Sequence, residues 1–259
     1  MIEKLEDRRL MSNSELVEVS PGYYQLNLAN SNQDFSINVY DTGGGSNQMT
    51  VTDNNGIGFD DGAGVYNSNN YYNVSFIGVN GGSANDKVEV YVDPGIGVGA
   101  SLSGNDGDDE LSLMGTTGGV WGGAGDDKLS ASDSYRVSMY GEAGNDQITV
   151  YGFCGEGVIE GNDDHDIIDA SASNGILNID GGSGSDIIYG SSNDDIIYGS
   201  GGIDTIHGGG GNDTIYVEGD NAIDEVYGDD GYDTAYVDIG TWSNSLSDTV
   251  HSDVEYYTL

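Results

Sequence analysis

Cysteine, proline and basic residues are scarce in this 259-residue chain. The single cysteine, Cys154, cannot form an intramolecular disulfide, which excludes a disulfide-stapled scaffold and leaves this side chain as a small buried filler. Two prolines against 44 glycines argue against collagen and against proline-rich linkers. Six basic residues against 45 acidic ones give a formal net charge of -39, so nucleic acid and anionic membranes are excluded as partners.

Long apolar runs are also missing. No stretch is long enough for a transmembrane segment, and no apolar segment follows the basic residues near the N-terminus, so no standard signal peptide is visible. We predict that residues 1–20 form a polar N-terminal segment, either disordered or related to sorting. Within it, residues 5–11 resemble a short Leu-Glu-Pro-Arg type segment of bacterial surface proteins, although Asp7 and Met11 depart from that pattern.

Recognisable catalytic motifs are absent from the sequence. It contains neither His-Glu-x-x-His nor Gly-x-Ser-x-Gly, the motifs of zinc metalloproteases and of lipases. The histidines lie far apart and are interpreted as surface residues rather than metal ligands or bases; they are His165, His207 and His251. The many aspartates could supply a carboxylate pair for glycoside hydrolysis, but their regular spacing makes that the weaker interpretation. We therefore expect that the protein is not an enzyme.

What the chain has in abundance is a nine-residue repeat. Between Gly181 and Tyr216 four copies follow without a gap: GGSGSDIIY, GSSNDDIIY, GSGGIDTIH and GGGGNDTIY. Every copy starts with glycine and has aspartate at position 6 and isoleucine at position 8. A period this strict predicts a solenoid, in which each repeat stacks on its neighbours.

Each part of the nonapeptide has a physical role. Glycines at positions 1, 2 and 4 permit positive φ and close backbone approach, so the first six residues form a turn whose carbonyl oxygens can converge. The aspartate adds a carboxylate. Such an all-oxygen cage suits a hard cation with six to eight ligands, namely calcium, and not the metals that prefer thiol or imidazole ligands. Positions 7 to 9 predict a short strand whose eighth residue points inward.

These repeats resemble the hemolysin-type calcium-binding repeats of the RTX family, whose consensus is GGxGxDxUx. The copy GGAGDDKLS at residues 122–130 fits that consensus at every defined position. The resemblance implies an all-β fold, a right-handed parallel β-roll or β-helix solenoid with terminal caps. It also implies that several Ca²⁺ ions are held between the turns of adjacent coils.

The spacing of the aspartates predicts two edges. Sixth-position aspartates first recur at intervals of 18 to 23 residues, one per coil, and later every nine residues, so that consecutive copies alternate between the edges. The predicted metal ligands on the first edge are Asp86, Asp109, Asp127, Asp146, Asp166, Asp186, Asp204 and Asp224, and those on the second edge are Asp195, Asp213 and Asp233. Backbone carbonyls are expected to complete the sites, such as those of Gly123, Gly125, Gly182, Gly184, Gly202, Gly209 and Gly211.

The position of each residue within the nonapeptide pattern also predicts the domain layout and the core. Residues 21–80 alternate apolar and polar side chains and are predicted to form an N-terminal β-solenoid cap. Residues 81–238 form the calcium-binding β-roll, and residues 239–259 a C-terminal cap. The eighth positions should stack as two inward columns: Val88, Leu111, Leu129, Ile148, Ile168, Ile188, Ile206 and Val226 in one sheet, and Ile197, Ile215 and Ala235 in the other.

Calcium binding by a secreted or cell-surface protein that folds on binding the ion is the function these features favour, with a structural or interaction role. The alternative is an accessory or adhesive module, binding a glycan or polymer, associated with an extracellular enzyme or the cell surface. Ninth-position rings should form ladders on the outer faces, with Tyr189, His207 and Tyr227 on one sheet and Tyr198, Tyr216 and Tyr236 on the other. These ladders either stabilise the strands or provide a surface for a glycan or for self-association.

Overall fold

A computed structural model gives the fold. It describes residues 14–28, 32–43, 46–55, 59–60, 65–66, 68–152, 155–217, 219–220, 222–237, 248–251 and 254–258. Over these residues the secondary structure is entirely β-strand and turn, and no helix capable of crossing a membrane is present among them. Cys154, Trp242 and most of the predicted N-terminal segment lie outside the described residues.

The strands form two long sheets. Sheet 1 has 14 strands: β1 (Glu15–Ser20), β2 (Tyr23–Asn27), β5 (Phe59–Asp60), β6 (Val65–Tyr66), β8 (Phe76–Asn80), β10 (Gly99–Asp106), β12 (Thr117–Ala124), β14 (Arg136–Ala143), β16 (Glu156–Asp163), β18 (Ile176–Ser183), β20 (Ile196–Gly201), β22 (Thr214–Val217), β24 (Asp233–Val237) and β26 (Val254–Thr258). Sheet 2 has 12 strands: β3 (Asp34–Gly43), β4 (Ser46–Asp53), β7 (Ser68–Tyr72), β9 (Lys87–Val92), β11 (Glu110–Met114), β13 (Lys128–Ser132), β15 (Gln147–Gly152), β17 (Ile167–Ser173), β19 (Ile187–Tyr189), β21 (Thr205–Gly211), β23 (Glu225–Gly231) and β25 (Thr249–Val250).

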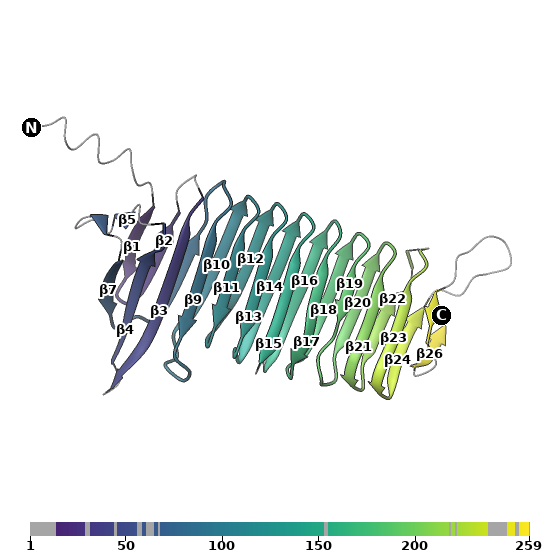
Figure 1. Ribbon diagram of the computed structural model, residues 1–259. Coiled ribbons are helices and arrows are strands. Elements are labelled where there is room, and N and C mark those ends of the chain that lie inside the picture. The colour runs from purple at the N-terminus through teal and green to yellow at the C-terminus, as the bar shows by residue number, and fades with distance from the viewer. Residues whose placement is uncertain are drawn as a thin grey trace, which may run out of the picture.

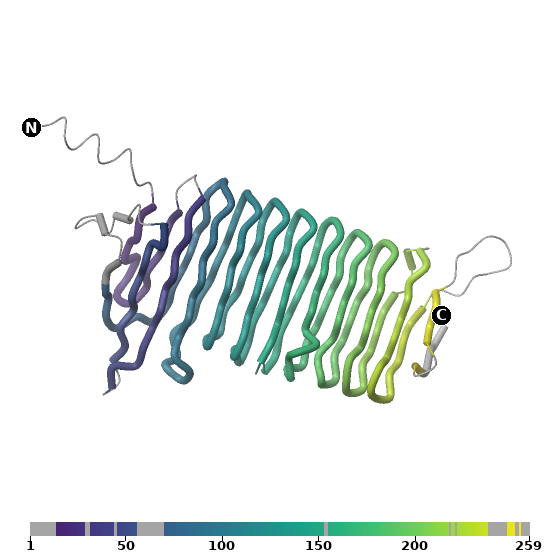
Figure 2. The backbone as a smooth tube through the Cα atoms, viewed as in Figure 1, coloured from purple at the N-terminus to yellow at the C-terminus, as the bar shows by residue number. Residues whose placement is uncertain are grey.

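From β8 onward the chain alternates between the two sheets, and each strand pairs in parallel with the strand two positions later in the order. Figure 1 shows the result, an elongated stack of flattened coils that runs from the N-terminal end to the C-terminal end. Figure 2 shows the turns of successive coils lying over one another along both long edges. We call the edge where the chain passes from sheet 1 to sheet 2 the first edge, and the opposite one the second edge. The predicted parallel β-solenoid is confirmed.

The core lies between the sheets and is built from alternate strand residues. In sheet 2 the predicted column is in register, with Val88 beside Leu111, Leu111 beside Leu129, and so on to Val226. In sheet 1, Ile197, Ile215 and Ala235 are likewise neighbours. All eleven predicted core residues are at most 2 % exposed, because the period of two along each strand sends every second side chain inward.

The two ends differ from the regular coils. At the N-terminal end β2 and β3 pair in parallel with β8 and β9 and so form a first coil. The strands β1, β4 and β7 are added to it in antiparallel pairs, so that Glu15–Ser20, inside the segment predicted to be polar, belongs to sheet 1. At the other end β25 and β26 continue both sheets in parallel beyond the last sequence repeat.

Candidate metal centre

Aspartates at the sixth position form two buried columns, one at each edge of the solenoid. Each is at most 2 % exposed and accepts, through Oδ1, a hydrogen bond from the backbone N–H of the equivalent residue one coil earlier. The N–O distances in the first column lie between 2.6 and 3.1 Å. Those in the second column, which contains Asp195, Asp213 and Asp233, are 2.7 to 2.8 Å. The structure thus brings all eleven predicted aspartates into the two predicted columns.

The first column extends beyond the predicted residues at both ends. Its first donor is the N–H of Gln33, which binds Asp86 Oδ1 at 2.9 Å. Its last acceptor is Asp248 Oδ1, 3.1 Å from the N–H of Asp224. A signal for Asp248 exists in the sequence, because the tripeptide Asp-Thr-Val beginning there matches positions 6 to 8 of the repeats. Gln33 carries no such signal.

The second carboxylate oxygens have a different environment. Asp86 Oδ2 accepts from the N–H of Gly82 at 3.0 Å, and Asp195 Oδ2 accepts from the N–H of Ser191 at 2.7 Å. Deeper in the columns this oxygen is buried and has no hydrogen-bond donor; the residues concerned are Asp109, Asp127, Asp146, Asp166, Asp186, Asp204 and Asp213. A buried acceptor left in this way is costly unless a proton or a cation reaches it.

Burial also changes the acidity of these carboxyl groups. Burial, the largest cause, and the charges of neighbouring aspartates raise the pKa of Asp127 and of Asp213 to about 8, although the hydrogen bond from the preceding coil lowers it. The same causes raise the pKa of Asp166 and Asp204 to about 7, and burial raises the pKa of Asp109 and Asp146 to about 6. Without a cation, part of the columns, and above all Asp127 and Asp213, therefore holds protons near neutral pH.

Glycine at position 1 is required by packing. A Cβ at Gly122 would lie closer than 3.0 Å to both Asp127 Oδ2 and the carbonyl oxygen of Gly141. The equivalent position in the next-but-one coil, Gly161, faces Asp166 Oδ2 and the Gly181 carbonyl in the same way. The unpartnered carboxylate oxygen and a carbonyl oxygen of the following coil thus converge over a glycine that leaves room for both.

Positions 2 and 4 are required for backbone conformation. In most turns both have positive φ, and position 2 has it at several residues other than glycine, such as Asn105 (74°) and Glu142 (78°). The turns that contain Gly82 and Ser191 at position 2 are exceptions. All seven glycines predicted to offer carbonyls occupy these positions and have positive φ. Carbonyl oxygens at these positions point to the next coil: Asn105 O faces Gly123, and Gly107 O faces Gly125. The turns therefore place rows of carbonyl oxygens between coils.

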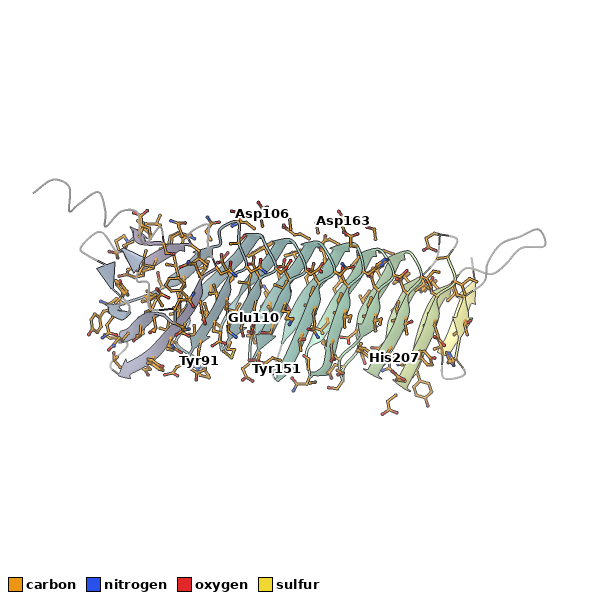
Figure 3. The ribbon with its side chains drawn as sticks, turned by 45° about the horizontal axis from the view of Figure 1, so that its top comes forward. Tyr91, Asp106, Glu110, Tyr151, Asp163 and His207 are labelled. Atoms are coloured by element: carbon orange, nitrogen blue, oxygen red, sulfur yellow. The ribbon has the colours of Figure 1, made fainter. Side chains whose placement is uncertain are left out.

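A second polar ladder runs along position 5, which the repeat consensus leaves undefined. Here the side chain of one coil accepts from the N–H of the next, in the opposite direction to the aspartate columns; for example, Asp126 N–H binds Asp108 Oδ1 at 3.1 Å. The ladder includes His165, whose Nδ1 accepts from Ser185 N–H at 2.6 Å. Figure 3 shows Asp106 and Asp163, two exposed third-position carboxylates, projecting from this same first edge.

The donor set available at both edges consists of oxygen. Within the described ranges no three His, Cys, Asp or Glu side chains gather into a cluster that could hold a metal ion. A cation between coils would therefore need backbone carbonyls as well as carboxylates, which is the ligand set of calcium. The residues present at the two edges fit a hard cation.

His207 and His251 lie on the outer face of sheet 2, stacked against Tyr227 and beside the carboxylates of Asp229 and Glu225.

Together, the fold and the turns define a parallel β-solenoid of glycine- and aspartate-rich nonapeptides. Comparison with known families shows four copies of the RTX calcium-binding nonapeptide repeat, at residues 121–150, 178–206, 189–223 and 198–235. The chain thus carries hemolysin-type (RTX) calcium-binding repeats, as predicted from the sequence. The turns that contain Asp86, Asp109 and Asp166 lie outside the matched segments, although they have the same hydrogen bonds. No curated protein and no solved structure was found to match the chain.

Proposed function

We propose that this protein is an extracellular or cell-surface calcium-binding solenoid with a structural role, and that it reaches its folded state by binding calcium. The observation that carries the proposal is the set of seven buried aspartate Oδ2 atoms without a hydrogen-bond donor, repeated coil after coil beside converging carbonyl oxygens. The RTX repeats, which are calcium-binding sequences, support the choice of ion.

The ligands in this proposal are the eleven column aspartates and the carbonyls of the turn glycines at positions 2 and 4. When bound, calcium supplies positive charge to a chain whose formal charge is -39 and whose buried carboxylates repel one another. The chain's own contribution is geometric: positive φ at positions 2 and 4 orients the carbonyls, and the Oδ1 hydrogen bonds fix the carboxylates between coils. Binding energy then becomes folding energy.

The location and the absence of catalysis are further parts of the proposal. Extracellular calcium modules bind with dissociation constants of about 10⁻⁴ to 10⁻³ M, so such a chain stays open in a cytosol and closes outside the cell. A non-enzymatic role is supported by the regular use of the column aspartates, each of which accepts a hydrogen bond from the preceding coil.

Calcium titration of the metal-free chain, followed by far-ultraviolet circular dichroism, tests the proposal. We expect a chain with little β-structure in chelator and a cooperative gain of β-structure as calcium reaches the millimolar range. Magnesium at the same concentration should have a weaker effect because it demands octahedral geometry and loses its water reluctantly. A β-rich spectrum that does not change on chelation would contradict the proposal.

The variant Asp127→Asn makes the test specific to the columns. The asparagine keeps an oxygen that can accept from Asp109 N–H, and its NH₂ group can donate toward the Gly141 carbonyl. It also removes a buried charge. We therefore expect opposite signs in two conditions. In chelator at about pH 9, where the Asp127 carboxyl is ionised, the variant has more β-structure than the parent by circular dichroism; in calcium it melts at a lower temperature than the parent.

Asp230→Asn is the matched control, because Asp230 is exposed at position 3 of a second-edge turn. It loses the same charge and should change little both the β-structure in chelator and the melting temperature in calcium. Equal shifts for Asp127→Asn and Asp230→Asn in calcium would show that the column carboxylates are not the ligands.

A further inference from the structure

A hollow lies on the second edge, away from the aspartate columns. Between β9 and β10 the chain makes a protruding loop of residues 93–98, whereas the next second-edge turn, residues 115–116, is short. Figure 2 shows the loop after β9 curling outward beyond the edge of the stack. The overhang leaves a hollow of about 230 Å³, whose lining includes Pro94, Val98, Thr116, Asp133 and Tyr135.

Tyr135 gives the hollow an accessible aromatic wall. Its side chain is 65 % exposed. The tyrosines of the C-terminal ladders differ, because Tyr216 is stacked on both sides, with centroids 4.9 and 4.7 Å away and planes within 10°. Ladder rings therefore present their edges to solvent, whereas Tyr135 can present a ring face. The electron-rich face of a tyrosine attracts the weakly positive C–H groups of a flat apolar ligand surface.

Two side chains that line the hollow, those of Thr116 and Asp133, can accept hydrogen bonds. Thr116 is buried and its hydroxyl donates to the carbonyl oxygen of Val98, so the lone pairs of that hydroxyl remain as acceptors. The carboxylate of Asp133 also lines the hollow and is a hydrogen-bond acceptor. Asp133 has a φ of 52°, a left-handed conformation that aspartate and asparagine adopt more readily than most other residues except glycine. An aromatic face beside a row of acceptors suits a ligand with C–H groups on one face and hydroxyl donors around its rim.

We propose that this hollow binds a single pyranose ring of a neutral glycan. Its volume is below the range of about 300 to 1,000 Å³ typical of sites for drug-sized ligands, which limits the occupant to about one sugar ring. The net charge of -39 and the Asp133 carboxylate disfavour an anionic sugar. The site uses none of the turns proposed to bind calcium. A negative result for the sugar site therefore does not contradict the proposed calcium binding, and the reverse also holds, provided that the protein is folded.

The test is a titration of the calcium-loaded full chain with methyl glucoside, methyl galactoside and methyl mannoside, followed by two-dimensional nuclear magnetic resonance of the ¹⁵N-labelled protein. Glucuronate and the open-chain polyol sorbitol are added in parallel. We expect at least one methyl hexoside to shift the amides of residues 95–98, 115–117 and 133–135. Glucuronate and sorbitol should bind at least about tenfold more weakly, because one is anionic and the other lacks a ring face.

Variants assign the site. Tyr135→Ala should weaken hexoside binding about tenfold, as expected for loss of an aromatic contact. Asp133→Asn should weaken it as well, and asparagine tolerates the left-handed backbone. Tyr232→Ala is the matched control, since Tyr232 is an 85 % exposed tyrosine on a turn of the same edge. The proposal is overturned if no hexoside shifts these amides, if glucuronate binds as well as the hexosides, or if Asp133→Asn and Tyr135→Ala, both folded by circular dichroism, bind like the parent.

Discussion

Glycines that look alike in the repeat have different physical reasons to be glycine. Position 1 lacks room, because a carboxylate oxygen and a carbonyl oxygen lie over its Cα, whereas positions 2 and 4 need positive φ. Position 3 has neither requirement: at Gly201 the atom nearest to an added Cβ would be 3.8 Å away, and other coils already have alanine there, at Ala124 and Ala143. Substitution therefore separates these roles.

Gly161→Ala should be strongly destabilising. The new Cβ would overlap Asp166 Oδ2 and the Gly181 carbonyl, which are backbone or tightly held atoms that cannot move away cheaply. We expect a loss of about 2 kcal/mol in the free energy of unfolding of the calcium-loaded protein, typical of overpacking a tight site. Chemical denaturation in saturating calcium measures it.

The control is Gly201→Ala, at position 3 of a turn on the same edge. It should be neutral, or slightly stabilising because alanine restricts the unfolded chain. If Gly161→Ala were tolerated as well as Gly201→Ala, the close approach of the carboxylate to position 1 would not exist in solution.

At the level of strands and ladders, the outer tyrosines act on one another. Tyr198, Tyr216 and Tyr236 lie on adjacent strands of sheet 1, and their planes are within 10° of parallel. Because the ring faces are occupied, the arrangement favours the stabilising role of the ladder over a binding role. On sheet 2 the ladder of Tyr189, His207 and Tyr227 gains a fourth ring, His251, which follows Asp248 by three residues, as each ninth-position ring follows its aspartate.

Replacing Tyr198, Tyr216 and Tyr236 together by threonine should lower the melting temperature of the calcium-loaded protein. Each lost ring pair costs about 0.2 to 1 kcal/mol, and threonine keeps the strand propensity. Self-association, measured by sedimentation velocity, and polysaccharide binding should stay unchanged. Unchanged melting together with lost association would instead identify the ladder as an interaction surface. Tyr232→Thr, outside the ladders, is the control.

The fold of the repeats could be predicted from the sequence because the nine-residue period determines which side chains point inward, which sheet each strand joins and on which edge each turn lies. Ile188 and Ile197 are nine residues apart and therefore face each other from different sheets, and Asp186 and Asp195 fall on opposite edges for the same reason. The alternation in residues 21–80 predicted strands but could not specify their partners, since antiparallel pairing such as β3 with β4 leaves the same period of two.

Interactions between coils were beyond prediction for a different reason. The bond from Asp109 N–H to Asp127 Oδ1 joins residues 18 positions apart, and a nonapeptide viewed alone contains only its acceptor. The position 5 ladder is still harder to predict, because Asn85, Asp108 and His165 all act as its hydrogen-bond acceptors although they are different residue types. Any side chain with a hydrogen-bond acceptor near its end can serve there, so no single residue type identifies this position in the sequence.

For the whole molecule, acid should partly replace calcium. The folded-state pKa of Asp127 and Asp213 is about 8 and that of Asp166 and Asp204 about 7, all above the ordinary value of 3.8. Carboxyls with a raised folded-state pKa contribute stability below the unfolded-state value, and this contribution is lost as pH rises through the folded-state pKa. The metal-free protein should therefore be more stable at pH 5 than at pH 8.5.

Circular dichroism of the chelated protein between pH 5 and 8.5 measures this dependence. We expect β-structure to increase as the pH falls through the range 8 to 6, and the stabilising effect of added calcium to be largest at high pH, where no protons compete for the carboxylates. A metal-free chain that is equally unfolded, or less folded, at pH 5 would contradict this expectation.

The aspartate columns also give the stack a sense of direction. Every column N–H reaches forward to a carboxylate supplied by the following coil, so a coil has one donating side and one accepting side. Excising one whole coil would bring a donating side against an accepting side again, whereas excising part of a coil would leave both unmatched. The molecule can thus change its length in units of one coil while its cross-section stays the same, and gain or loss of whole repeats is the change in this gene product that its architecture absorbs most easily.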